Sequence, residues 1–216
     1  MNIEKFIDKC LPERSPSFFT GVPDSQLKSL CNYLIEKRGI SFDHIIGANE
    51  GSWVAFATGY HLSTGNIPVV YLQNSGLGNI INPIASLAND KVYGIPCVYI
   101  IGWRGEPGVK DEPQHTFQGE ITLKLLEDMD IAYMVIDSNL HDTELEAKAA
   151  EFKTLLDKGK SVAYVVKKGV LTHDSTVSYK NDNQLVREEI IKHIVDTSAE
   201  DIIISTTGKT SRELFE

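Results

Sequence analysis

Short runs of β-branched and aromatic residues alternate along the chain with stretches whose apolar residues recur at helical spacing. Two of the helical stretches are residues 24–39 and residues 141–159, and each ends at a glycine. The strand-like runs are residues 17–20, 42–46, 68–73, 96–103, 131–137 and 161–168. Strands that alternate with helices pair in parallel, because a parallel return needs a connection of about a dozen residues or more. Residues 1–170 are therefore predicted to form one α/β domain, a doubly wound six-stranded parallel sheet flanked by helices.

The pattern changes after this first domain. Residues 171–184 are polar and aperiodic, which is typical of a linker. A helical pattern resumes near residue 185, residues 201–206 have the composition of a strand, and the last residues enter another helix. This order predicts that residues 185–216 begin a second, incomplete α/β domain. The alternative is a short C-terminal extension that packs on the first sheet.

Charge and cysteine content limit the classes of function. The formal net charge of −9 argues against nucleic acid or an anionic membrane as a partner. No apolar run approaches the roughly 20 residues that span a membrane, and the amphipathic pattern of residues 1–11 is not that of a secretion signal. The cysteines, Cys10, Cys31 and Cys97, are widely spaced and form no C-x-x-C pair, which argues against disulfides and a zinc site and favours a cytoplasmic location.

Ligands of doubly wound folds bind at the carboxyl ends of the strands, so the turns that follow the strands are the places to search. The first turn is GVPDS, formed by Gly21, Val22, Pro23, Asp24 and Ser25. Glycine and proline shape a tight turn, and Asp24 or Ser25 stands just before a helix. A helix N-cap explains either side chain without any ligand.

The second turn, GANEG, places the carboxylate of Glu50 where an apolar strand gives way to a largely apolar helix. Acidic residues are common in the first turn of a helix, because the exposed N–H groups and the helix dipole favour negative charge. Position alone therefore leaves a structural role open.

The third turn lies within YLQNSGLGN and contains Gln73, Asn74, Ser75, Gly76 and Gly78. Glycines here allow the backbone to approach a ligand closely and leave N–H groups free at the helix start. The spacing resembles part of a G-x-G-x-x-G dinucleotide loop, but a lone G-x-G is weak evidence.

The fourth loop, residues 102–120, is long for a connection between a strand and a helix, and long loops at this edge are usually functional or mobile. It carries Arg104, Lys110, Gln114 and His115. A histidine in a loop is more often a solvated surface residue than a catalyst, so His115 has a structural alternative.

Taken together, GVPDS, GANEG, YLQNSGLGN and DEPQH, in this order and on these turns, resemble the pyrimidine-binding domain of thiamine-diphosphate-dependent decarboxylases. The resemblance covers nearly the whole chain. It implies thiamine diphosphate and Mg²⁺ as cofactors, with the metal and diphosphate ligands in a second domain outside these 216 residues, so no metal ligand is expected here. It also implies a homo-oligomer whose sites lie between subunits, and it predicts that these residues alone are inactive.

The resemblance assigns roles to individual residues. It implies that Glu50 hydrogen-bonds the aminopyrimidine of the cofactor and exchanges a proton with it, so that the cofactor activates its own reactive carbon. Asp24 and His115 are expected to handle substrate and transfer protons. The expected cofactor-binding residues are Glu50, Gly21, Val22, Pro23, Gln73, Asn74, Ser75 and Gly76. The expected substrate-binding residues are Asp24, Ser25, Asn74, Arg104, Lys110, Gln114 and His115.

Within that family the resemblance is greatest to enzymes that decarboxylate phosphonopyruvate, a small anionic 2-oxo acid, to phosphonoacetaldehyde and carbon dioxide in phosphonate (2-aminoethylphosphonate) biosynthesis. A basic group such as Arg104 or Lys110 is expected to neutralise the phosphonate, since the chain as a whole is acidic. Decarboxylation of sulfopyruvate is the nearest alternative. A non-catalytic cofactor-binding or regulatory subunit is the alternative from another class.

Overall fold

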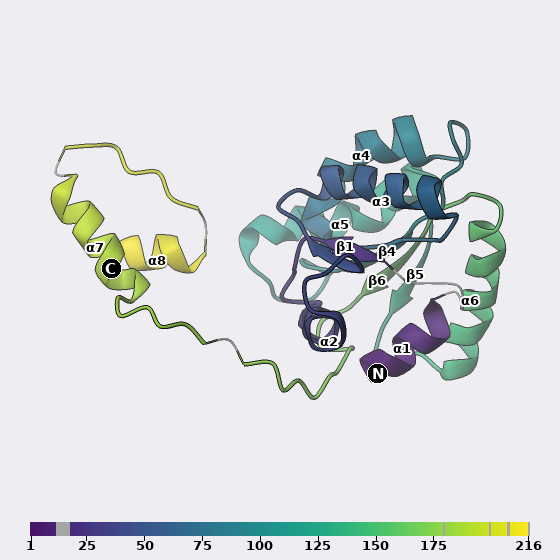
Figure 1. Cartoon of the computed structure of the whole chain (residues 1–216), viewed down its shortest axis with the longest axis horizontal. Coiled ribbons are helices and arrows are strands. Elements are labelled where there is room, and N and C mark those ends of the chain that lie inside the picture. The colour runs from purple at the N-terminus through teal and green to yellow at the C-terminus, as the bar shows by residue number, and fades with distance from the viewer. Residues whose placement is uncertain (12–17, 179, 199, 207, 216) are drawn as a thin grey trace. The chain divides into compact units, whose positions relative to one another are not determined.

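The computed structural model describes residues 1–11, 18–178, 180–198, 200–206 and 208–215. The chain divides into two compact units, Met1–Val177 and Ser178–Glu216, and each is considered by itself. Figure 1 labels the helices of both units. Residue 17 of the first expected strand and residue 179 of the expected linker lie outside the described residues.

The first unit contains a six-stranded, entirely parallel sheet with the strand order β2-β1-β3-β4-β6-β5. The strands are β1 (Phe19–Gly21), β2 (His44–Ile46), β3 (Val69–Gln73), β4 (Val98–Gly102), β5 (Ala132–Ile136) and β6 (Val162–Val166). Every strand overlaps a run that the sequence predicts, and β1 extends one residue beyond its run, so the fold class is confirmed.

Helices and short helical turns connect the strands. They are α1 (Ile3–Cys10), α2 (Lys28–Arg38), α3 (Glu50–Thr64), the 3₁₀ turn η1 (Asn74–Gly76), α4 (Leu77–Pro83), the π-helical turn η2 (Ile84–Ala88), α5 (Pro113–Asp128) and α6 (Asp142–Leu156). Helix α2 ends at Gly39, whose φ of +65° is a conformation that glycine adopts without strain.

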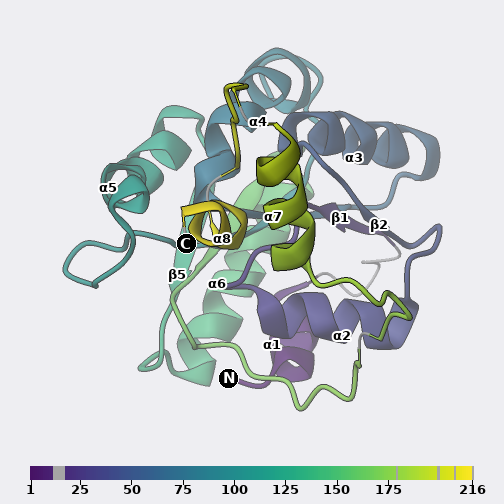
Figure 2. The ribbon, with the colours of Figure 1, turned by 90° about the vertical axis from the view of Figure 1, so that its left-hand side faces the viewer.

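Two hydrophobic cores lie on opposite faces of the sheet. Alternate residues of each strand point to opposite faces, so Val69 and Tyr71 belong to one core and Val70 and Leu72 to the other. The first core includes buried residues of α1, α2 and α6, and the second includes buried residues of α3, α4 and α5. Figures 1 and 2 show α3 and α4 on one side of the sheet and α1 and α2 on the other. The first unit is therefore a three-layer α/β domain.

The compact part of the first unit continues past residue 170. Leu171 is buried, and the backbone of Thr172 accepts a hydrogen bond from Ile3 and donates one to Met1. These bonds attach the start of the expected linker to the N-terminal helix α1.

The second unit contains α7 (Arg187–Thr197) and α8 (Lys209–Phe215), which a bidentate ion pair between Arg187 and Glu213 connects. The expected strand over residues 201–206 is wrong, because these residues adopt no regular structure. Ile202 and Ile204 are more than 90% exposed, and a single strand has no partner for its backbone groups. None of the helices in the described ranges combines the length and hydropathy of a membrane span.

Candidate active site

The strand order reverses direction between β1 and β3, since β2 lies on one side of β1 and β3 lies on the other. In open α/β sheets such a reversal leaves a crevice at the carboxyl ends of the two strands. The turns that contain Asp24, Glu50 and Gln73 all begin at this edge of the sheet. The structure therefore brings three of the predicted turns together at one place.

Gly21 ends β1 in close contact with β3. A Cβ atom at this position would lie 1.9 Å from the carbonyl oxygen of Tyr71, so no side chain fits. The next residue, Val22, donates its backbone N–H to the same carbonyl at 3.1 Å. Pro23 and Ser25 are exposed at the rim of the turn. The glycine thus allows the first turn to lie directly on the end of β3.

Asp24 is buried, with only 6% of its surface exposed. Its Oδ1 accepts a hydrogen bond from Nε2 of Gln73 at 2.6 Å, and its Oδ2 accepts one from the backbone N–H of Gln26 at 3.1 Å. Burial raises the pKa of Asp24, and the bonds from Gln73 and Gln26 partly oppose that rise. Asp24 is not the N-cap of α2, which begins four residues later at Lys28.

Gly102, the last residue of β4, makes room for this carboxyl group. A Cβ atom on Gly102 would lie 2.1 Å from Oδ2 of Asp24 and 3.0 Å from Cβ of Gln26. The buried position of Asp24 therefore depends on a glycine from a different strand.

Glu50 is the first residue of α3 and is half-buried. The N-cap of this helix is Asn49, whose side chain accepts from the backbone N–H of Ser52 at 3.2 Å, so Glu50 is not needed as the cap. Its Oε2 accepts a hydrogen bond from Nδ2 of Asn79 on α4 at 2.7 Å. Its carboxyl group also lies against Gly76, where a Cβ atom would be 2.5 Å from Cδ and Oε1.

Helices α3 and α4 approach closely beside this carboxyl group. A Cβ atom on Gly51 would lie 2.5 Å from the carbonyl oxygen of Asn79. The close packing keeps Asn79 within hydrogen-bonding distance of Glu50. Oε2 thus has a fixed donor, while Oε1 faces a glycine and, within the described ranges, accepts no hydrogen bond.

Asn74 has a structural role that corrects the expected one. Its side chain is fully buried, its Nδ2 donates to the carbonyl of Arg104 at 2.7 Å and to Oγ1 of Thr122 at 2.8 Å, and its Oδ1 accepts from the backbone N–H of Arg104 at 3.0 Å. These bonds fasten the loop after β4 to the end of β3. The side chain therefore has no surface to offer a cofactor or a substrate.

Arg104 is likewise not a free cation. Its guanidinium group makes a bidentate ion pair with Asp111, with Nε 2.7 Å from Oδ2, and both side chains are less than 20% exposed. Asp111 also accepts the backbone N–H groups of Gly105 and Glu112. The guanidinium group holds the pKa of Asp111 well below its usual range. The pair closes the loop on itself, which corrects the expectation that Arg104 neutralises a substrate.

The remaining residues of this loop lie near its end. Lys110 and Gln114 are exposed, and His115 is half-buried. Gln114 and His115 belong to the first turn of α5 and not to an irregular loop. Gly105 packs on the backbone of His115, since a Cβ atom there would lie 1.8 Å from its carbonyl oxygen. The braced loop therefore sets the position of His115.

Several residues of this edge escaped the sequence analysis as site residues: Gln26, Asn79, Gly102 and Asp111. Asn79 and Gly102 carry some signal, because an amide in an apolar helix start and a glycine that ends an apolar strand are both unusual. Gln26 and Asp111 carry none, since nothing in their local sequence indicates which distant groups they meet.

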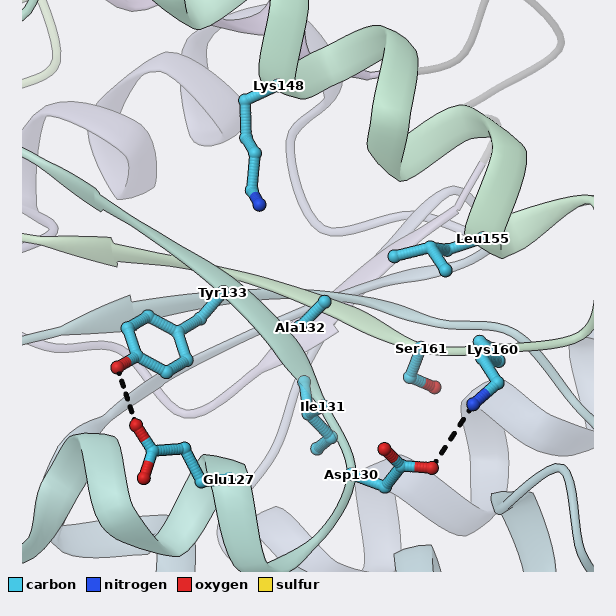
Figure 3. A pocket seen from close by; sticks show the side chains of 9 residues that line it. All are labelled: Glu127, Asp130, Ile131, Ala132, Tyr133, Lys148, Leu155, Lys160 and Ser161. Atoms are coloured by element: carbon cyan, nitrogen blue, oxygen red, sulfur yellow. Dashed lines mark hydrogen bonds and ion pairs between the residues drawn. The ribbon is translucent and has the colours of Figure 1, made fainter.

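Other parts of the molecule offer no alternative site of this kind among the described residues. Within the described residues, no group of three or more His, Cys, Asp or Glu side chains could hold a metal ion. A pocket of about 380 Å³ lies beside β5, near the amino ends of β5 and β6 and thus away from the candidate site. Figure 3 shows Tyr133 hydrogen-bonded to Glu127 and Lys160 paired with Asp130 in this pocket.

The fold and the site define an α/β cofactor-binding domain with two carboxyl groups at a glycine-lined sheet edge. The family model described as thiamine pyrophosphate enzyme, N-terminal TPP binding domain, matches residues 1–127. The chain belongs to this family. Thiamine pyrophosphate is the same compound as thiamine diphosphate, so the expected cofactor class is confirmed at the level of the family.

Individual relatives agree with this assignment. Phosphonopyruvate decarboxylase of Streptomyces viridochromogenes is 32% identical over 212 residues, which cover 90% of this chain and 52% of the relative. Sulfopyruvate decarboxylase subunit alpha of Methanococcus maripaludis is 38% identical over 133 residues, 62% of this chain and 76% of the relative. The chain thus spans about half the length of the phosphonopyruvate decarboxylases that it matches.

A solved structure supports the fold alone. The crystal structure of benzoylformate decarboxylase from Polynucleobacter necessarius superposes with a TM-score of 0.53 at 15% identity. The match covers 93% of this chain and 37% of that one.

Proposed function

We propose that this chain is the pyrimidine-binding part of a thiamine-diphosphate-dependent 2-oxo-acid decarboxylase, with Glu50 as a catalytic residue. The observation that carries the proposal is the position of the Glu50 carboxyl group, which Asn79 holds by one oxygen while the other faces Gly76. A half-buried carboxyl group with one oxygen available fits a ring nitrogen that both accepts and donates a proton. The absence of a side chain at Gly76 makes room for the carboxyl group itself, since a Cβ atom there would lie 2.5 Å from its Cδ and Oε1.

Individual residues of this chain are proposed to have different roles in the reaction. When bound, the cofactor supplies a nucleophilic carbon and an electron sink for the carboxyl group that leaves. Glu50 holds and exchanges a proton at its carboxyl oxygen. Asp24, buried and with a raised pKa, is proposed to transfer a proton to or from a substrate atom. His115 is a second candidate for proton transfer, and the turn Gly21–Val22–Pro23 and Ser75 are proposed to border the ring.

The proposed substrate is phosphonopyruvate, in phosphonate (2-aminoethylphosphonate) biosynthesis in the cytoplasm. Its support is the likeness to phosphonopyruvate decarboxylases over 90% of this chain. Sulfopyruvate is the alternative, because 62% of this chain matches the alpha subunit of a sulfopyruvate decarboxylase. Because Asp111 neutralises Arg104, we propose that Lys110 binds the acid group of the substrate. Ser25, Gln114 and His115 are proposed as further substrate-binding residues. Equal or faster turnover of sulfopyruvate in a steady-state comparison would contradict the phosphonate assignment.

We further propose that the second unit begins a diphosphate-binding domain and that the complete site forms between subunits of a homo-oligomer. Its exposed isoleucines at 202 and 204 are suited to a sheet that other residues complete. The described residues offer no cluster for Mg²⁺, so the metal is assigned to a different part of the assembly. On this proposal the 216 residues alone will not decarboxylate a 2-oxo acid.

The test is Glu50→Gln in the full-length protein. Glutamine keeps a hydrogen bond to Asn79 and to the ring but cannot exchange a proton. Cofactor affinity, measured by calorimetry with Mg²⁺, is expected to stay within several-fold, while kcat falls by about 100-fold or more. Glu120→Gln, an exposed position of α5, is the matched control. Unchanged turnover in Glu50→Gln would remove Glu50 from the catalytic residues, whereas cofactor binding without turnover in the unmodified full-length protein would favour a non-catalytic binding module.

A further inference from the structure

Three side chains form a continuous chain of hydrogen bonds at the ends of β1 and β3. The hydroxyl of Ser75 donates to Oε1 of Gln73 at 2.7 Å, and Nε2 of Gln73 donates to Oδ1 of Asp24 at 2.6 Å. The chain runs from an exposed serine to a buried carboxyl group. Gln73 therefore uses both ends of its amide within the protein.

We propose that Gln73 and Ser75 are positioning residues for Asp24, which fix the orientation of its carboxyl group and stabilise its ionised form. This replaces the expectation that Gln73 contacts the cofactor. The catalytic consequence rests on the proposed function, whereas the effect on Asp24 itself does not.

The direction of the hydrogen bonds explains the arrangement. An ionised carboxylate only accepts, so Gln73 must turn its amide N–H towards Asp24. Its own carbonyl oxygen then needs a donor, and the hydroxyl of Ser75 supplies one. A protonated Asp24 keeps one carbonyl oxygen as an acceptor, but its O–H must then face one of two N–H donors, that of Gln73 or the backbone N–H of Gln26. The network is therefore complete for ionised Asp24, and one of its bonds is weakened when Asp24 is protonated.

Few other charged groups lie near Asp24 among the described residues. On the α2 side lie the backbone N–H of Gln26 and the thiol of Cys31, whose pKa burial raises to about 11, so that it stays neutral. From β4 comes Gly102, which has no side chain. The loop after β4 contributes the positive charge of Arg104, which lowers the pKa of Asp24 less than the bond from Gln73 does. Removing the Gln73 donor should therefore take away the largest single effect that opposes burial.

The direct test is a carbon-13 NMR titration of the Asp24 carboxyl group in the cofactor-free full-length protein. In Gln73→Met, which keeps the volume and loses the donor, the titration midpoint is expected to rise by roughly one pH unit or more. In Ser75→Ala, a mild exposed change, it should rise in the same direction by less. Gln184→Met and Ser63→Ala, at exposed positions elsewhere, should leave it unchanged. An unchanged midpoint in both Gln73→Met and Ser75→Ala overturns the proposal.

A second readout separates positioning from cofactor contact. In the full-length enzyme the limb of the pH profile of kcat/KM that Asp24 controls should move to higher pH in Gln73→Met, with cofactor affinity unchanged. If Gln73 instead contacts the cofactor, the dissociation constant will rise and the limb will stay in place. If the NMR midpoint moves but no 2-oxo acid is decarboxylated by the unmodified protein, the positioning role stands and the proposed function fails.

Discussion

A methyl group on Gly76 would lie 2.5 Å from both Cδ and Oε1 of Glu50, closer than non-bonded atoms can stand. The two residues come from different helical elements, η1 and α3, and their contact fixes where the carboxyl group can be. A methyl group added at position 76 should therefore displace the carboxyl group of Glu50 while the glutamate itself is kept.

Gly76→Ala should displace the Glu50 carboxyl group and lower kcat of the full-length enzyme by about 10-fold or more, because small errors in the placement of catalytic groups are costly. Gly76 has φ −79° and ψ −7°, which alanine adopts freely, so the fold should be kept. Steady-state kinetics and thermal unfolding check the two expectations. The control is Gly78→Ala on α4, where a Cβ atom would meet nothing within 4 Å. Equal activity of both variants would contradict the prediction.

Gly102→Ala should act on Asp24 in the same way. The new methyl group would meet Oδ2 of Asp24 at 2.1 Å and Cβ of Gln26 at 3.0 Å, so the carboxyl group must give up a hydrogen bond or the backbone must shift. Overpacking of this kind costs about 1–3 kcal/mol. Urea denaturation measures this cost, with Gly59→Ala in the open part of α3 as the comparison. A variant as stable as the wild type, with an unmoved Asp24, would show that the site is more plastic than described.

Asp111→Asn should loosen the loop that carries Lys110. The change removes a partly buried charge that accepts from Arg104, Gly105 and Glu112, at a cost of about 2 kcal/mol. Trypsin should then cut faster after Lys110. Asp128→Asn, which breaks only an exposed pair with Lys124, should cost less than about 0.5 kcal/mol and leave the cleavage rate unchanged.

His44 predicts how stability depends on pH. Its ring is fully buried, with Nδ1 2.7 Å from the carbonyl of Gly39 and Nε2 2.9 Å from the hydroxyl of Tyr71. Burial lowers the pKa of His44 below its ordinary value of 6.5. As the pH falls below about 6.5, His44 therefore takes up a proton in the unfolded chain while the ring in the folded chain stays neutral. The stability that the neutral ring contributes is complete above pH 6.5 and is lost as the pH falls through the lowered folded pKa.

His44→Gln should remove this contribution to the pH dependence. Between pH 6.5 and the folded pKa the slope of the unfolding free energy should fall by up to about 1.4 kcal/mol per pH unit. Denaturation series at several pH values provide the measurement. His193→Gln, on exposed α7, should leave the slope as it is. A slope that is the same in wild type and His44→Gln would mean that the ring takes up its proton at the same pH in the folded and the unfolded chain.

The strands and the helices of the first unit were predictable from the sequence because their signals are local. Apolar runs rich in β-branched residues mark β3, β4 and β6, and helical spacing followed by a glycine marks α2. The rule that ligands bind at the carboxyl ends of parallel strands located the turns that meet at this edge, and the family resemblance assigned roles to their residues. The strand expected at 201–206 was wrong because strand formation depends on a partner, which no local pattern reports.

The misassigned side chains have a common cause. Asn74 meets Thr122, 48 positions away, and nothing near Asn74 indicates that its amide points inward. Arg104 and Asp111 are close in sequence, but only the path of the loop brings them together. A polar residue at a functional edge can serve the ligand or the scaffold, and its partners decide which. The roles of Glu50, Asp24 and His115 stay predictions.

The two carboxyl groups of the site are supported from opposite layers of the molecule. Glu50 opens α3, which packs into one core, while Asp24 precedes α2, whose Leu30 and Leu34 pack into the other. Because the sheet separates these cores, a substitution that repacks one core is expected to leave the carboxyl group supported by the other core in place. Evolution could therefore retune proton delivery for a new substrate while the group that activates the cofactor is inherited unchanged.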